Sequence, residues 1–184
     1  MPTARESLLD AASAALGDRP WTAIRMVEVA AAAGVSRQTL YNEFRSKEGL
    51  AQALVRRECD AYLAGVERAL ALAGRDGGDA GECFAAAAGW TLRTARRSPL
   101  VHAALSDTRR QRPPLPDLVA AFHTRTTDAL VRGFPQLRPH DISWACEAAI
   151  RLTLSYVIAP AASDEDACLR VAQLVRSLLS WPAR

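Results

Sequence analysis

The sequence predicts an all-α protein, and three observations support that fold class. Apolar residues recur at helical spacing along the chain, and no run alternates between apolar and polar residues as a half-buried strand does. Segments rich in glycine or proline separate these periodic stretches. The composition, 49% hydrophobic and 23% charged residues over 184 positions, is typical of a folded globular protein.

The first helix is expected at residues 5–16, because apolar residues recur there at i, i+4 and i+8 and Gly17 follows them. A second, short helix is expected at 26–33. Gly34 follows it and is suited to the left-handed conformation that a tight turn between helices needs.

The third and fourth helices are expected to begin after serine residues. Ser36 is placed to cap a helix at 37–44, and Ser46 is placed to cap a much longer helix at about 47–73. A small N-terminal domain of three helices, residues 1–48, therefore precedes a larger helical domain, residues 49–184.

Composition predicts two loops in the larger domain, GRDGGDAG at 74–81 and RRQRPPLP at 109–116. Between and after these loops the helical period predicts five further helices. They lie near residues 82–97, 99–107, 117–133, 142–159 and 164–180.

The last two of these helices carry more apolar surface than a small core covers. The helix at 142–159 is apolar nearly all round, and the last helix has an apolar seam suited to packing along another helix. We expect a two-fold homodimer in which both helices pack on their symmetry mates as a four-helix bundle. The seam consists of Val171, Leu174, Leu178 and Trp181.

Cysteine spacing and segment hydrophobicity exclude several protein classes. The N-terminus, MPTARESLLDAA, lacks the apolar core of a signal peptide, and no uncharged apolar stretch reaches the roughly 20 residues that span a bilayer. We therefore expect a soluble cytoplasmic protein with reduced, buried thiols. The cysteines match no paired metal spacing, and we expect neither a metal nor a cofactor. They are Cys59, Cys83, Cys146 and Cys168.

The helix at 37–44 presents a face that a core helix would not tolerate. Its outward side combines aromatic, amide and guanidinium groups, while Leu40 and Phe44 turn toward the neighbouring helices. Two short helices joined by a glycine turn, with this polarity, predict a helix-turn-helix whose second helix enters the major groove of DNA. Arginine suits the guanine acceptors, and glutamine or asparagine suits adenine. The outward residues are Arg37, Gln38, Tyr41 and Asn42.

Bulk charge does not indicate nucleic-acid binding. The net charge of the chain is +3, but residues 1–50 hold six basic and six acidic side chains. Lys47 lies just inside the fourth helix, where the helix dipole adds to its attraction for a phosphate. Arg25, Ser36 and Thr39 complete the set of predicted DNA-binding residues.

The segment VEVAAAAGVSRQTLYNEFRSKEGLAQAL resembles the DNA-binding signature of the TetR family of bacterial transcriptional regulators. With the first helix the resemblance covers about the first 55 residues, and RLTLSYVIAP at 151–160 is similar to a segment near the end of many members. Membership implies a homodimer that represses transcription from a palindromic operator and releases it when a small ligand binds the C-terminal domain. The resemblance rests on Ala30, Gly34, Val35, Ser36, Thr39, Leu40, Tyr41, Phe44, Lys47, Glu48 and Leu50.

The start of the second helix departs from this family pattern. Members usually have serine or threonine there, which caps the helix and contacts a phosphate, whereas this chain has Ile24 and Arg25. Thr22 could cap a slightly earlier start, and Arg25 could itself reach the phosphate.

Aromatic and basic residues of the larger domain allow two interpretations. They line a cavity for a mainly apolar ligand, formed by the helices between residues 82 and 159, or they are ordinary core residues. For Arg151, an i,i+4 pair with Glu147 is preferred to a contact with an anionic ligand. The candidates are Phe84, Trp90, His102, Phe122, His123, Trp144, Arg151 and Tyr156.

The pattern favours a DNA-binding regulator over two other classes. An enzyme is not expected, because the histidines and thiols are scattered and no phosphate loop or paired-histidine metal motif is present. A helical small-molecule-binding or interaction protein without DNA binding would explain the apolar last helices. It would not explain the outward polar face of the helix at 37–44.

Overall fold

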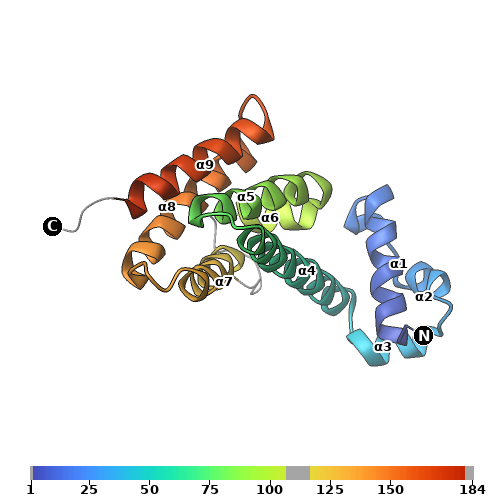
Figure 1. Ribbon diagram of the computed structural model, residues 1–184. Helices are drawn as coiled ribbons and strands as arrows, with labels where there is room; N and C mark the ends of the chain where they lie inside the picture. The colour runs from blue at the N-terminus through green and yellow to red at the C-terminus, as the bar shows by residue number, and fades with distance from the viewer. Residues whose placement is uncertain (1, 107–116, 181–184) are drawn as a thin grey trace. The chain divides into compact units, whose positions relative to one another are not determined.

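The computed structural model describes residues 2–106 and 117–180, which form nine α-helices and no strand (Figure 1). The all-α prediction is confirmed for these residues, and none of their helices is both long and apolar enough to cross a membrane. The loop predicted at 109–116 and Trp181 lie outside the described residues. The helices are α1 (Ala4–Asp18), α2 (Met26–Ala32), α3 (Arg37–Phe44), α4 (Lys47–Arg75), α5 (Ala80–Arg97), α6 (Pro99–Ser106), α7 (Leu118–Gly133), α8 (Pro139–Ile158) and α9 (Asp164–Leu179).

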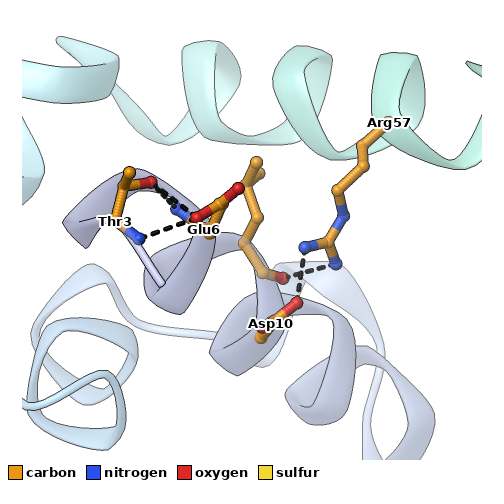
Figure 2. Close-up of polar contacts among 5 residues, drawn as sticks. Thr3, Glu6, Asp10 and Arg57 are labelled. Carbon is orange, nitrogen blue, oxygen red and sulfur yellow. Dashed lines mark hydrogen bonds and ion pairs between the residues drawn. The ribbon is translucent and has the colours of Figure 1, made fainter. Parts of the chain in front are cut away.

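The chain divides into two compact units, Met1–Arg57 and Glu58–Arg184. The division falls inside α4, later than the boundary expected after residue 48, because the first turns of α4 are bonded to the N-terminal helices. The guanidinium of Arg57 in α4, for example, donates to the carboxylate of Asp10 in α1 at 2.6 Å (Figure 2).

In the N-terminal unit a small apolar core lies among α1, α2, α3 and the start of α4. A capping box begins α1: Thr3 Oγ1 accepts the N–H of Glu6 at 3.2 Å, and the Glu6 carboxylate accepts the N–H of Thr3 at 2.7 Å (Figure 2). Gly17 does not end α1 as expected, because helical bonding continues to Asp18. The buried apolar residues are Leu8, Leu9, Ala12, Ile24, Val29, Ala30, Leu40, Phe44, Leu50 and Leu54.

The turn between α2 and α3 is the one that the sequence predicts. Gly34 has a φ of 67°, in the left-handed region that favours glycine. Ser36 Oγ accepts the N–H of Thr39 at 3.0 Å and so caps α3. Ser46 Oγ accepts the N–H of Gly49 at 3.1 Å in the first turn of α4.

In the C-terminal unit, α9 packs against α5 and α8, and α7 packs against α8 (Figure 1). Ion pairs join α5 and α9 at both ends. Arg176 near the end of α9 binds Asp79, the N-cap of α5, at 2.7 Å, and Arg96 near the end of α5 binds Asp164 at the start of α9. The two helices are therefore antiparallel.

Close packing joins α4 to α5 in the same unit. A Cβ at Gly65 of α4 would lie 2.1 Å from the Trp90 ring of α5, whose indole N–H donates to the carbonyl oxygen of Tyr62 at 3.0 Å. The loop between these helices is shorter than predicted, because both helices extend into the segment 74–81.

The cysteines of the chain are free thiols, and only Cys168 is not fully buried. Burial raises the pKa of Cys59 and of Cys146 to about 11. These two thiols are therefore protonated and weakly nucleophilic at neutral pH.

Candidate nucleic-acid interface

The outward face of α3 is polar, and its inward face is core. Leu40 and Phe44 are 0% and 4% exposed, whereas the four polar and aromatic residues predicted to face outward all lie at the surface. Tyr41 is 40% exposed. The exposed residues are Arg37, Gln38, Tyr41 and Asn42.

Hydrogen bonds order part of this face before any partner binds. Gln38 Nε2 donates to Asn42 Oδ1 at 3.0 Å, one turn further along α3. This pairing leaves the Gln38 carbonyl oxygen and the Asn42 amide nitrogen for an outside partner. The hydroxyls of Ser36 and Thr39 lie 2.9 Å apart within the cap of α3.

The start of α2 corrects one expectation. Thr22 does not cap α2, because it lies in a separate 3-10 turn, Trp21–Ala23. Arg25 is the N-cap, forms no side-chain capping bond and is exposed. Ile24, at 2% exposure, belongs to the core. Of the two residues that depart from the family pattern, only Arg25 is thus available to a phosphate.

Residues 1–50 have no net charge, but ion pairs neutralise only some of the charged side chains of the N-terminal unit. Three acids form ion pairs with arginines that lie outside the turn between α2 and α3. The distances are 3.6 Å for Arg5–Glu43, 2.6 Å for Arg19–Glu28 and 2.6 Å for Arg57–Asp10. Three exposed guanidiniums at the ends of α2 and α3 have no ion pair within the described residues. They belong to Arg25, Arg37 and Arg45.

Lys47 is the first residue of α4, as the sequence predicts, and its side chain contacts two other residues of the N-terminal unit. Its Nζ donates to the carbonyl oxygen of Thr22 at 3.2 Å and lies 5.6 Å from the centroid of the Trp21 ring. Because an ammonium group has three N–H donors, this bond leaves two for a phosphate.

Sequence reasoning missed the tight junction between α3 and α4. Arg45 has a φ of 64°, and the N–H of Ser46 donates to the carbonyl oxygen of Phe44 at 2.7 Å. The backbone also passes so closely that a Cβ at Gly49 would lie 2.0 Å from that same oxygen. Gly49, inside an otherwise helical segment, was the signal for this close approach.

The predicted ligand-binding residues do not gather at one site. Phe84 and Phe122 are fully buried and form an aromatic cluster with Tyr62, with ring centroids 6.2 Å and 5.8 Å from Phe122. Trp90 packs over Gly65 of α4. His123 is half-buried, and its Nε2 lies 3.1 Å from the carbonyl oxygen of Ser143 in α8.

Three of the remaining ligand candidates are surface residues, and Tyr156 is half-buried. His102 is exposed, and Trp144 is 58% exposed on α8, so neither is enclosed as a cavity residue would be. Arg151 is exposed and donates to Glu147 at 2.8 Å, which is the pair that the sequence favours.

Three buried hydroxyl oxygens in α6 and α7 were not singled out from the sequence. None has a hydrogen-bond partner among the described residues, although buried hydroxyls normally have one. They belong to Ser106, Thr126 and Thr127.

The predicted dimer seam is wrong at Val171. This residue is 0% exposed, because its side of α9 faces the core of its own chain. Leu174 and Leu178 are half-buried. The apolar side chains that α8 and α9 expose most are Trp144 at 58%, Ile158 at 64% and Leu169 at 54%.

Comparison with protein families accounts for both units. A model of the bacterial regulatory proteins of the tetR family matches residues 8–54, and a model of the bacterial tetracyclin repressor C-terminal domain matches residues 79–177. The chain belongs to the TetR family. TetR-family proteins are DNA-binding transcriptional regulators that bind small-molecule ligands and act as dimers, and they are not enzymes.

Individual TetR-family relatives agree with this assignment. The HTH-type transcriptional regulator AlkX of Mycobacterium tuberculosis is 32% identical over 182 residues, which cover 93% of this chain and 82% of AlkX. The repressor AlkX of Dietzia sp. strain DQ12-45-1b, implicated in biodegradation of n-alkanes, has a similar structure, with a TM-score of 0.64 and 23% identity over 95% of this chain and 94% of its own. The structure of RolR bound to resorcinol has a TM-score of 0.60 and 20% identity over 98% and 95% of the two chains. These two structures share the fold.

Proposed function

We propose that this TetR-family protein is a ligand-responsive repressor that binds a palindromic operator as a homodimer. The observation that carries the proposal is the exposed polar face of α3, held on a capped and tightly packed helix-turn-helix. A rigid support of this kind is what base-specific hydrogen bonding requires.

Residues of α3 are proposed to read base edges, and residues around it to contact phosphates. Arg37 lies at the start of α3, where a guanidinium suits the two guanine acceptors, and the paired amides of Gln38 and Asn42 suit adenine. Phosphate contacts are proposed for Arg25, Ser36, Thr39 and Lys47, and for Tyr41, which belongs to the exposed face itself.

The homodimer is proposed to form through the exposed apolar side chains of α8 and α9. Trp144, Ile158 and Leu169 are each more than half exposed in the single chain, and packing them on a second copy would remove them from water. Two recognition helices would then lie about one turn of duplex apart, so that both half-sites are read on one face of the DNA.

The effector is proposed to be mainly apolar, with a group that forms hydrogen bonds. The support is the aromatic cluster around Phe122, together with the unpartnered buried hydroxyls of α6 and α7. Similarity to the AlkX regulators, one of them implicated in biodegradation of n-alkanes, also favours an apolar effector.

Selection of bound sequences from random duplex DNA tests the proposal and identifies the operator. We expect a palindrome to be enriched. Arg37→Ala or Gln38→Ala should relax the preference at single base pairs, at a cost of about 1–3 kcal/mol each. By contrast, Lys47→Ala should weaken binding to all duplexes alike and reduce the salt slope by about one unit per protomer.

No enrichment above random sequence would support the alternative, a helical small-molecule-binding or interaction protein without DNA binding. Full operator preference in the Arg37 and Gln38 variants would instead remove α3 from base recognition.

A further inference from the structure

The backbone between α3 and α4 is strained at one arginine. Arg45 has φ and ψ of 64° and −44°, and the bond from the Ser46 N–H to the Phe44 carbonyl oxygen makes it the centre of a γ-turn. This turn is rare, because an L-residue with a Cβ is crowded at positive φ.

Glycine would remove this strain, and the protein uses glycine wherever else the described backbone has positive φ. The two other such positions are Gly34 and Gly77, at φ of 67° and 84°. Strain of this kind in a non-glycine residue points to a role for its side chain.

The side chain of Arg45 has no structural role of its own. It is exposed, and no hydrogen bond or ion pair joins its guanidinium to another of the described residues. The nearby acid, Glu43, is matched by Arg5, whose guanidinium lies 3.6 Å from the carboxylate and 4.6 Å from the centroid of the Phe44 ring. Arg45 therefore forms no ion pair with an acid of the described residues.

The position of Arg45 places this charge beside a DNA backbone once α3 enters the major groove. An eight-residue helix is about 12 Å long, and the major groove is about 12 Å wide. The residue directly after the helix thus lies near the wall of the groove, where the phosphates are. Lys47, the predicted phosphate ligand, follows two residues later.

We propose that Arg45 contacts a phosphate of the operator, and that the strained turn is retained for this contact. The inference rests on the proposed function, because it places α3 in the groove. It adds to the DNA interface a residue that the sequence pattern did not indicate.

The test is the salt dependence of DNA binding by full-length Arg45→Gly, measured on the selected operator and on a random duplex. Glycine accepts the turn, so we expect the midpoint of thermal unfolding to stay the same or rise while affinity falls. The plot of log K against log salt should become less steep, by about one unit of slope per protomer, on both duplexes. Asparagine tolerates positive φ but keeps a Cβ, so Arg45→Asn should reduce the slope as Arg45→Gly does. Arg45→Lys keeps the charge and should keep the slope.

Arg56→Gln is the matched control for charge. Arg56 is an exposed arginine of α4 with no ion pair in the described part of the chain, nine residues after Lys47, which is about 13 Å along the helix. Its neutralisation should leave the slope nearly unchanged.

An unchanged slope in both neutral Arg45 variants would overturn the inference, and so would an equal loss in Arg56→Gln. Reduced affinity with an unchanged slope would assign Arg45 to the geometry of the junction instead. If the parent protein showed no sequence preference, the proposed operator function would fail, whereas the slopes on the random duplex would still decide the role of Arg45.

Discussion

Ser36 stabilises the recognition helix at its first turn, where helical N–H groups lack partners within the helix. Its Oγ accepts the N–H of Thr39 at 3.0 Å. We expect Ser36→Ala to lower the free energy of unfolding by about 1 kcal/mol, as measured by chemical denaturation.

Ser36→Asp separates capping from DNA binding. A carboxylate caps a helix as well as a hydroxyl does, so stability should be kept, but its negative charge should weaken binding to every duplex. Equal stability of the parent and the alanine variant would mean that the cap contributes nothing to folding.

At the scale of helices, the ion pairs between α5 and α9 make stability depend on pH. The guanidinium of Arg176 lowers the pKa of Asp79, and that of Arg96 lowers the pKa of Asp164. A carboxyl with a lowered pKa in the folded state stabilises the protein above its unfolded pKa, near 4, and this stability is lost as the pH falls through the folded value. Because the Asp79 side chain is 52% exposed and that of Asp164 is 26% exposed, solvent screens both pairs and the effect is modest.

Asp79→Asn tests this dependence, because asparagine retains the N-cap of α5 but carries no charge. We expect the variant to be slightly less stable than the parent at pH 7. Its free energy of unfolding should also fall less steeply than that of the parent between about pH 5 and pH 2, as measured by chemical denaturation at each pH. An acid profile that matches the parent would show that the pair with Arg176 is not formed in solution.

The contact between α4 and α5 depends on the fit of Gly65 under Trp90. Gly65→Ala should destabilise the protein, because the added Cβ would lie 2.1 Å from the ring. Trp90→Ala should lower the free energy of unfolding by about 2–4 kcal/mol through the loss of a half-buried ring.

A double-mutant cycle checks that the two residues are coupled. In the Trp90→Ala background, Gly65→Ala should cost much less than it does alone, by chemical denaturation. Additive effects would show that the Trp90 ring does not pack on Gly65.

Local signals explain why the helices were predictable while some side-chain environments were not. Caps such as Ser36 and a glycine such as Gly34 act within one turn, so their effect can be derived from neighbouring residues. An apolar spacing shows that a helix has an apolar side but not which element covers it. Trp144 was therefore expected in a cavity or in the core and lies at the surface, while Val171 was expected at an interface and lies in the core. Gly49 marks the close approach of the backbone between α3 and α4, but nothing in the local sequence marks the positive φ of Arg45.

At the scale of the whole molecule, the proposed dimer predicts different outcomes for two equally exposed leucines. Leu169 on α9 and Leu72 on α4 are both 54% exposed. Leu169→Glu should place like charges at the proposed interface, giving monomers by light scattering and weak operator binding by gel shift. Leu72→Glu should remain dimeric with parental affinity. A dimeric Leu169→Glu variant with full affinity would locate the interface elsewhere.

Because Lys47 lies over the ring of Trp21, the intrinsic fluorescence of this tryptophan can report on DNA binding. Indole emission responds to a nearby cation, so a phosphate that draws the ammonium away should change the fluorescence of Trp21 without any attached dye. Trp144, on the exposed side of α8, should instead shift its emission when water leaves that surface. A variant that keeps only Trp21 would therefore follow operator binding, and one that keeps only Trp144 would follow subunit association.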